Sequence, residues 1–256
     1  MEDKNRIDEF SKVTRHPHEQ MLKLVAKGFY KELIKYGVEE PEVLTVAGHL
    51  LDNVALKSNP NRIPLETYSG QLSIKDVQND WSQSESLSMG NVTISPIQEI
   101  DLKIAVEWMK RPEIQKYFYP QFPDTVENLG KYFEFPNRAY FRISHENELV
   151  GIIGADQIDR ESEKLEMRKL IGDSSMRGKG IGKRATFLFL YYSFIIERFE
   201  KVFMHSLDIN IRNLNLNGKF GFYIEGVFFE DAKIDGERHD LVRMALTRLV
   251  WEELFK

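Results

Sequence analysis

The stretch Leu170-Ile-Gly-Asp-Ser-Ser-Met-Arg-Gly-Lys-Gly-Ile-Gly-Lys-Arg184 joins a segment of strand character to a long apolar segment of helical character. Glycines at 178, 180 and 182 remove side chains, so backbone N–H groups can converge on an anion at the start of the helix. Four positive charges lie in the same loop, on Arg177, Lys179, Lys183 and Arg184. The loop predicts a binding site for a phosphate or pyrophosphate group. The simpler alternative is a solvated turn with glycine caps.

The spacing of these glycines excludes one phosphate loop and leaves another open. A nucleoside-triphosphate loop requires Gly-x-x-x-x-Gly-Lys-Ser/Thr, and from Gly172 the second glycine falls on Arg177. The stretch from Gly180 to Ala185 satisfies the looser dinucleotide pattern Gly-x-Gly-x-x-Ala. However, polar residues 173–179 separate the strand from the glycines, and only 76 residues follow Gly180. A nicotinamide-dependent oxidoreductase is therefore a lesser alternative.

Length and composition narrow the class of protein. The 256 residues suit one main domain plus an addition, and 42% hydrophobic residues suffice for a packed core. Lysine and arginine number 35 against 40 acidic residues, so the net charge of −5 offers no overall basic field for nucleic acid or anionic lipid. The absence of cysteine excludes disulfides and thiol chemistry. We expect neither nucleic acid nor membrane as a partner.

Targeting and metal signals are weak. Residues 1–12 are charged and lack the apolar core of a secretory signal, and the apolar run 185–196 is too short to cross a bilayer. A cytoplasmic location is the resulting expectation. His16 and His18 have no third ligand nearby in the sequence, so we assign no metal.

Periodicity predicts a helical N-terminal part and an α/β C-terminal part. Apolar residues at helical spacing predict helices over 17–36 and 41–57, and their broad apolar faces leave a homodimer open. The polar stretch 82–90 is predicted to be a linker, which places a helical domain at 1–88 and the main domain at 89–256. In the main domain, strands are predicted over 91–95, 139–144, 148–158, 164–171, 201–208, 223–233 and 239–248, and helices over 99–110, 124–133, 182–198 and through Asn213. This order predicts an α/β domain with a mixed, mostly antiparallel central sheet flanked by helices.

Two motifs of the chain resemble those of the GNAT superfamily of acyl-CoA-dependent N-acyltransferases. The pyrophosphate loop of that family, Arg/Gln-x-x-Gly-x-Gly/Ala, is matched by Arg177-Gly-Lys-Gly-Ile-Gly182. The family also carries an Asn after the next strand, with Gly-Phe eleven and twelve positions later, and Asn210, Gly221 and Phe222 match it. The resemblance covers about 91–249. It is closest to the branch that holds ribosomal-protein N-terminal, polyamine and amino-sugar-nucleotide acetyltransferases.

The resemblance implies direct transfer of the acetyl group of acetyl-CoA, as co-substrate, to a primary amine of a small molecule or a protein N-terminus. The co-substrate would lie in a V-shaped opening between strands 164–171 and 201–208. Rate would come from alignment of the two reactants and from N–H donors aimed at the developing oxyanion. The residues implied to bind the co-substrate are Ile171, Gly172, Arg177, Gly178, Lys179, Gly180, Ile181, Gly182, Lys183, Asn210, Asn213 and Asn217.

Asn217 departs from the family pattern, because the family often has a Tyr there that protonates the departing thiolate. An amide cannot act as an acid at neutral pH. A thiol has an ordinary pKa of about 8.5, so the thiolate can leave without the help of an acid. A catalytically weak acetyl-CoA sensor or protein-interaction module is therefore the alternative to an enzyme.

Two residues are candidates for the base that deprotonates the amine. Glu166 is the first, because the resemblance implies a carboxylate on this strand, and His205 on the other strand of the V is the second. The simpler interpretations are a strand-surface Glu paired with Lys164 or Arg168, and a histidine satisfied by a neighbour. Further carboxylates that could add charge at strand ends are Asp156 and Asp208.

An aromatic, proline-bounded segment, Tyr117-Phe-Tyr-Pro-Gln-Phe-Pro123, is predicted where the family forms its acceptor wall. Tyr117, Tyr119 and Phe122 are the candidate contacts to the acceptor. A hydrophobic seam packed on the sheet is the equally simple alternative.

Overall fold

The structure is a computed structural model that describes residues 2–47 and 67–256. The chain divides into two compact units, Met1–Thr67 and Tyr68–Lys256. The described part of the first unit is helical, with α1 (Glu2–Lys35) and a second helical segment at 40–47. The first helix ends one residue before its predicted end, and Gly37 at φ +81° supplies the left-handed residue that follows a helix end.

In the first unit, the start of the first helix differs from the prediction, and the end of the second predicted helix lies outside the described residues. The helix predicted from Pro17 begins earlier, at Glu2, and so includes His16 and His18. Pro17 removes only one backbone N–H, and the helix continues through it. Residues 48–57 of the second predicted helix lie outside the described residues.

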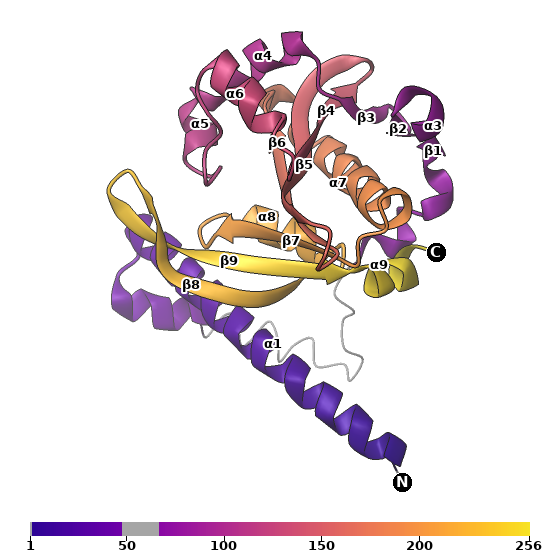
Figure 1. Ribbon diagram of the computed structural model, residues 1–256. Helices are drawn as coiled ribbons and strands as arrows, with labels where there is room; N and C mark the ends of the chain where they lie inside the picture. Colours follow the sequence, from indigo (N-terminus) through magenta and orange to yellow (C-terminus); the bar gives the residue numbers. More distant parts are fainter. Residues whose placement is uncertain (1, 48–66) are drawn as a thin grey trace. The chain divides into compact units, whose positions relative to one another are not determined.

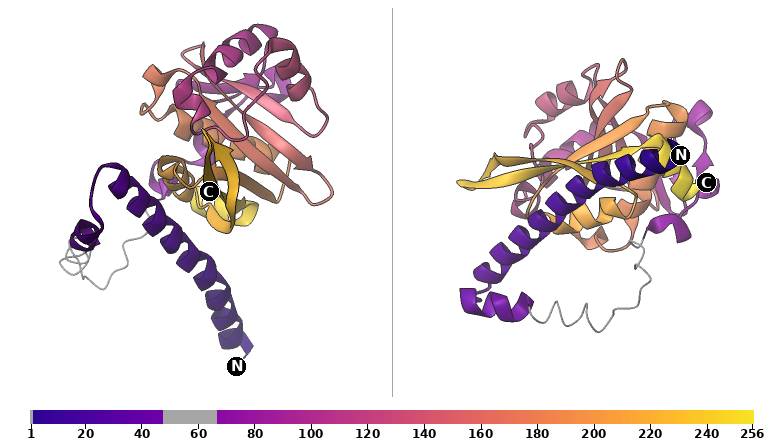
Figure 2. Two further views of the ribbon diagram at one scale, coloured as in Figure 1. Left: turned by 90° about the vertical axis from the view of Figure 1, so that its left-hand side faces the viewer. Right: turned by 90° about the horizontal axis from the view of Figure 1, so that it is seen from below.

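The second unit consists of one sheet with helices on both of its faces (Figures 1 and 2). Its strands are β1 (Gln78–Asn79), β2 (Leu87–Met89), β3 (Val92–Pro96), β4 (Ala139–His145), β5 (Glu148–Asp159), β6 (Lys164–Ile171), β7 (Lys201–Leu207), β8 (Tyr223–Ile234) and β9 (Glu237–Thr247). Its helices are α3 (Trp81–Ser84), α4 (Glu99–Met109), α5 (Pro112–Gln115), α6 (Val126–Phe133), α7 (Ile181–Tyr191), α8 (Ile211–Gly218) and α9 (Arg248–Phe255). Short 3-10 helices at η1 (Tyr68–Gly70), η2 (Ile74–Asp76) and η3 (Ser174–Met176), and a π-helix at η4 (Tyr192–Ile196), complete the unit.

The strands form a nine-stranded sheet in the order β1-β2-β3-β4-β5-β6-β7-β9-β8. Neighbouring strands run antiparallel except β6 and β7, which run parallel. The predicted mixed, mostly antiparallel sheet flanked by helices is confirmed. The last predicted strand is one residue too long, because residue 248 begins α9, whose Trp251 and Phe255 are buried.

Residues 78–90, which include the whole stretch predicted as a linker, extend the sheet instead. Strand β2 pairs with β1 and β3, and its Leu87 and Met89 are buried. Trp81 of α3 packs on Phe141 and Tyr192, with ring centroids 5.6 and 4.8 Å away. The structure places 68–88 in the second unit because two alternating apolar residues among serines suffice for a short outer strand.

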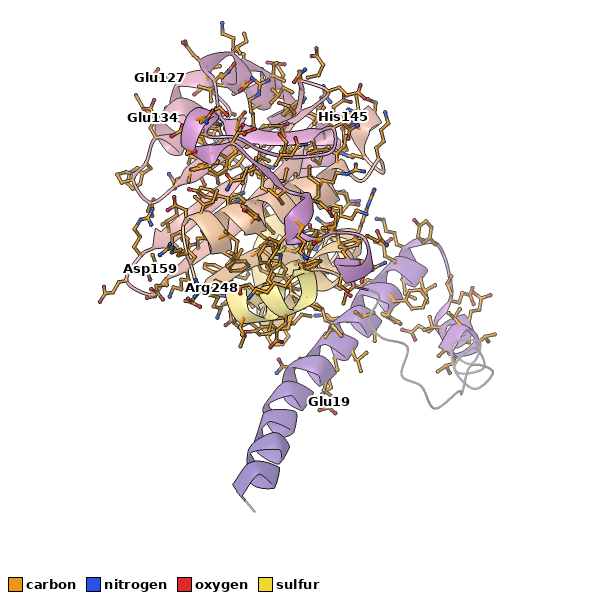
Figure 3. The ribbon with its side chains drawn as sticks, turned by 90° about the vertical axis from the view of Figure 1, so that its right-hand side faces the viewer. Glu19, Glu127, Glu134, His145, Asp159 and Arg248 are labelled. Atoms are coloured by element: carbon orange, nitrogen blue, oxygen red, sulfur yellow. The ribbon has the colours of Figure 1, made fainter. Side chains whose placement is uncertain are left out.

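The two faces of the sheet are covered by different helices. Helix α7 packs against β3, β5 and β6, and its Phe187 and Phe189 are fully buried. On the other face, α4 and α6 enclose a core cluster that includes Trp108, Leu129 and Leu170. Glu127 and Glu134 project from the exposed side of α6 (Figure 3).

Candidate active site

Strands β6 and β7 pair at only three positions and then separate. The pairs are Lys164 with Lys201, Leu165 with Val202, and Glu166 with Phe203. Beyond them, β6 pairs only with β5 and β7 only with β9. Figure 1 shows the two strands diverging towards the side that carries α5 and the tip of the β8–β9 hairpin. The opening expected between these strands is therefore present in the fold.

This opening has two chemically different sides, because side chains alternate along a strand. Lys169 of β6 donates a hydrogen bond to Thr186 of α7 at 2.5 Å, and Asn213 of α8 donates to Ser206 of β7 at 3.2 Å. These strand residues therefore lie on the side of α7 and α8. Their neighbours along the strands point to the opposite side, which α4 and α6 cover.

Both candidate bases lie on the α4–α6 side, where they contact each other. Nδ1 of His205 is 2.8 Å from Oε1 of Glu166. The second carboxylate oxygen, Oε2, accepts from Nε2 of Gln157 at 2.7 Å. A carboxylate accepts, so Nδ1 carries the proton and Nε2 of the imidazole is left as the ring's proton acceptor. Glu166 therefore pairs with His205 rather than with Lys164 or Arg168.

Gln157 is the site residue that the sequence did not indicate. The register of β5 on β6 shifts between Asp156 and Asp159, and Gln157 within this bulge has φ +51°. A bulge re-aims a side chain out of the regular alternation. The amide thereby reaches Glu166, and a single glutamine in a strand carries no sequence signal of such a turn.

Asp156 anchors a charged network beside this pair. Its carboxylate accepts from Arg138 at 2.9 Å, from Arg168 at 3.2 Å and from the Tyr132 hydroxyl at 2.5 Å. Burial and the hydrogen bond to Asp156 raise the pKa of Tyr132. Burial opposes the charge on Arg168, yet the nearby tyrosines and Asp156 raise its pKa overall. Asp156 thus supports the wall of the site through its ion pairs.

Arg168 also holds the aromatic segment 117–123 on the sheet. It donates to the backbone oxygen of Pro120, and its guanidinium lies 4.6 Å from the ring centroid of Phe118 and 4.7 Å from that of Phe122. Phe122 is buried in the core, whereas Tyr117 is 41% exposed. Tyr119 packs against a cluster of Leu207, Ala232 and Leu241 on strands β7, β8 and β9. The segment therefore connects the β6 and β7 halves of the sheet.

The glycine-rich loop forms the start of α7 on the other side of the opening. Gly178 at φ +86° and Gly180 at φ +77° adopt the left-handed conformation, and Gly180 is the N-cap of the helix. The first helical hydrogen bond runs from the N–H of Arg184 to the oxygen of Gly180. The N–H groups of residues 181–183 precede that bond and are directed out of the helix end. Such a helix end attracts an anion.

Two arginines hold the base of this loop through backbone oxygens. Arg177 donates to the oxygen of Ile171 at 3.2–3.3 Å, and Arg111 donates to the oxygen of Gly172 at 3.0 Å. The N–H of Gly172 donates to the oxygen of Val150 at 3.0 Å. By the alternation of an antiparallel ladder, the N–H of Ile171 then points towards the opening. Of the two expected backbone donors, only Ile171 faces the opening.

The three asparagines order helix α8. The side chain of Asn210 caps the helix by accepting from the N–H of Asn213 at 3.3 Å. The amide nitrogen of Asn217 donates to the backbone oxygen of Asn213 at 2.8 Å and to its side-chain oxygen at 3.1 Å. Oδ1 of Asn217 is buried and has no partner among the described atoms. Together they link α8 to β7 through Ser206.

Residues 91–223, more than half of the chain, match the family model of the acetyltransferase (GNAT) domain. The chain belongs to the GNAT acetyltransferase family. As a GNAT acetyltransferase, it transfers the acetyl group of acetyl-CoA to an amine.

Individual relatives of this GNAT acetyltransferase are distant. It is 21% identical over 163 residues to spermidine N(1)-acetyltransferase of Escherichia coli strain K12, a match that covers 62% of this chain and 87% of the relative. It is 23% identical to the Vibrio cholerae enzyme of the same name, over 60% and 91% of the two chains. The crystal structure of spermidine N-acetyltransferase from Vibrio cholerae in complex with CoA and spermine superposes with a TM-score of 0.59 at 20% identity, over 63% and 98%. This likeness shows the shared fold.

The remaining polar residues near the acetyltransferase site complete its description. Asp208 is buried and accepts from the N–H of Ile209 at 3.0 Å, with Nδ1 of His239 at 3.4 Å. Among the side chains that the structure describes, those of residues 19–47 and 67–256, no three His, Asp or Glu groups are placed to hold a metal ion. Within residues 2–47 and 67–256, every helix is too short or too polar to span a bilayer.

Proposed function

We propose that this GNAT acetyltransferase acetylates a primary amine of a small polycationic molecule of the polyamine class. Acetyl-CoA is held on the α7–α8 side of the opening, and the amine approaches from the α4–α6 side. The observation that carries the proposal is the pair of Glu166 and His205, hydrogen-bonded at 2.8 Å where β6 and β7 separate.

On the α7–α8 side, the pyrophosphate of acetyl-CoA rests on residues 177–183. The N–H groups at the start of α7 and the side chains of Lys179 and Lys183 supply the positive field, while Gly178 and Gly180 shape the turn. The N–H of Ile171 faces the thioester oxygen and stabilises the oxyanion that develops on it. Asn210, Asn213 and Asn217 hold the α8 wall against which the co-substrate lies.

On the α4–α6 side, His205 removes the proton from the amine. Glu166 fixes the tautomer with Nδ1 protonated, so Nε2 accepts the proton of the incoming ammonium. The neutral amine attacks the thioester carbon and the carbon–sulfur bond breaks. The proton that the nitrogen loses as it becomes an amide passes to the departing thiolate, so CoA leaves as the thiol. Gln157 keeps Glu166 in place through its second oxygen.

A polycationic acceptor suits the acidic rim of this side. Residues 230–238 of the β8–β9 hairpin carry four exposed acidic side chains against Lys233 and Arg238. Tyr119 packs against the cluster that includes Ala232 of that hairpin, which places the hairpin beside the aromatic segment. The relatives named above as spermidine acetyltransferases support the same class of acceptor. Use of acetyl-CoA supports the expected cytoplasmic location.

A panel of amines tests the acceptor class. Thiol release from acetyl-CoA is measured with spermidine, spermine, butylamine, glucosamine and a short peptide with a free N-terminus. Spermidine or spermine is expected to give kcat/KM at least about tenfold above the others, because several cationic groups meet the carboxylates. A preference for the amino sugar or the peptide would contradict the acceptor class. If CoA binds but no amine causes thiol release, the result would support the alternative of an acetyl-CoA sensor. That alternative was suggested by Asn217, which stands where the family often has a Tyr.

Gly182→Ala tests the position of the co-substrate. A Cβ at Gly182 meets only Cγ1 of Ile171 at 3.6 Å, an ordinary contact, so the variant should fold with an equal or higher Tm. Binding of CoA should weaken about tenfold, because the methyl group intrudes where the backbone meets the pyrophosphate. Gly130→Ala in α6 is the matched control and should leave binding unchanged. Equal affinity of both variants for CoA would place the pyrophosphate elsewhere.

A further inference from the structure

Residues 68–72 precede the part of the chain that matches the family, yet they lie against helices α7 and α8. The N–H of Tyr68 donates to the backbone oxygen of Lys219 at 2.9 Å. The Tyr68 ring meets the ring of Phe220 edge-on, with centroids 4.9 Å apart, and Leu72 is buried. This segment is therefore fixed on the unit that holds the acetyltransferase site.

Two ammonium groups converge on the ring of Tyr68. Nζ of Lys183, in the first turn of α7, is 5.0 Å from the ring centroid, and Nζ of Lys219, just after α8, is 5.9 Å from it. Lys183 also donates to the side-chain oxygen of Gln71 at 2.8 Å. A ring face and an amide oxygen carry no net charge, so these two contacts do not neutralise the charge of Lys183.

The pKa of Lys183 is lowered by its surroundings. Partial burial lowers it first, and the charges of Arg184 and Lys219 lower it further. Like charges are thus held close together in a chain whose net charge is −5. A dianion placed between Lys183 and Lys219 would relieve this repulsion.

We propose that Tyr68, Gln71, Lys183 and Lys219 form a subsite for the 3′-phosphate of CoA. The inference rests on the proposed placement of the pyrophosphate at residues 177–183. Lys183 belongs to both sites, so the nucleotide end of the same ligand lies next to it. Tyr68 holds the two ammonium groups on one surface, and Gln71 orients Lys183. The subsite is thereby completed by residues from outside the family-matched domain.

The test compares CoA with 3′-dephospho-CoA, which differs only by this phosphate. Dissociation constants are measured by calorimetry on the full chain for the wild type and for Lys183→Met, Lys219→Met and Tyr68→Leu. The wild type should prefer CoA by about 30-fold, consistent with two charge-assisted contacts. Each lysine variant should reduce that preference to about fivefold or less. Lys75→Met replaces an exposed lysine of η2, just after this segment; this variant is the control and should keep the preference for CoA.

The outcomes separate this inference from the proposed function. A preference for CoA that stays unchanged in both lysine variants would overturn the subsite while leaving the pyrophosphate site intact. Failure of the wild type to bind either nucleotide would contradict the co-substrate site itself. Because Tyr68 contacts the core, Tm is recorded for its variant. A lower Tm with an unchanged ratio of dissociation constants would show a purely structural role and contradict the assignment. Lys219→Met keeps the backbone hydrogen bond to Tyr68 and so isolates the charge.

Discussion

Glu166 and His205 lie 39 positions apart in the sequence, yet Oε1 of one and Nδ1 of the other are 2.8 Å apart. The contact forms at the last paired position of β6 and β7, so the carboxylate and the imidazole stand where the sheet opens. Glu166 is 5% exposed, and both of its oxygens are engaged. We interpret His205 as the group that meets the amine and Glu166 as the residue that positions it.

His205→Ala should lower kcat by about 10²–10³-fold with little change in the KM for acetyl-CoA, because a general base acts in the chemical step. Glu166→Gln should lower kcat less and should change the pH profile of kcat, since the imidazole loses the partner that fixes its tautomer. His145→Ala is the control: this histidine projects from the outer end of β4 (Figure 3), where Asn91 contacts it at 2.7 Å. Full activity of His205→Ala would contradict its role as base.

Lys169 should make the protein more stable as pH rises. Burial lowers the pKa of its ammonium from 10.5 to about 7 in the folded protein. Between those values the unfolded chain binds a proton that the folded protein does not, so the free energy of unfolding increases with pH. The cost of the buried charge is fully present below pH 7 and is lost as pH approaches 10.5.

Lys169→Met removes this titration. The variant should be more stable than the wild type by about 2–3 kcal/mol at pH 6, with a smaller gain at pH 9, given about 1.4 kcal/mol per pKa unit and a remaining hydrogen bond to Thr186. Urea unfolding at pH 6, 7.5 and 9 measures the difference. Lys164→Met, on the same strand and 3.5 Å from Asp159, is the control and should show no such trend. A gain that is equal at all three pH values would contradict the buried charge.

Gly172→Ala should destabilise the base of the co-substrate loop. A Cβ at this position would lie 1.9 Å from the indole of Trp108, so the ring or the strand end must move. Overpacking of this kind costs about 1–3 kcal/mol. Adding Trp108→Leu should recover part of the Tm lost by Gly172→Ala, because the smaller side chain makes room. Additive losses in the double variant would show that the two residues do not compete for the same space.

Local patterns in the sequence predicted the elements around the opening. Strand β6 has the predicted bounds, 164–171, because β-branched and apolar residues end at a glycine-rich loop. The positive φ of Gly178 and Gly180 follows from the same cluster of glycines. The sequence also named both members of the Glu166–His205 pair as candidates.

Contacts between residues that are distant in the sequence could not be predicted from local sequence patterns. The sequence suggested Lys164 or Arg168 as partners of Glu166, because a sequence shows which residues are adjacent along the chain but not which are adjacent in space. Gln157 reaches Glu166 through a bulge, and Tyr68 reaches Lys183 across more than a hundred residues. The guanidinium of Arg177 donates to the oxygen of Ile171, a contact that the sequence did not indicate. Such pairings depend on tertiary packing rather than on periodicity.

The alternation of side chains along β6 and β7 gives the proposed reaction two separate entrances. In the proposed placement, acetyl-CoA and the amine approach through opposite faces of one sheet, so neither has to depart before the other arrives. Initial-rate lines at varied concentrations of both should therefore intersect, and no acetylated protein should accumulate between half-reactions. The order of product release then depends on whether CoA or the acetylated amine dissociates first from its own side of the opening. In this placement, the separation of β6 from β7 beyond Glu166 accounts for the kinetic scheme as well as for the chemistry.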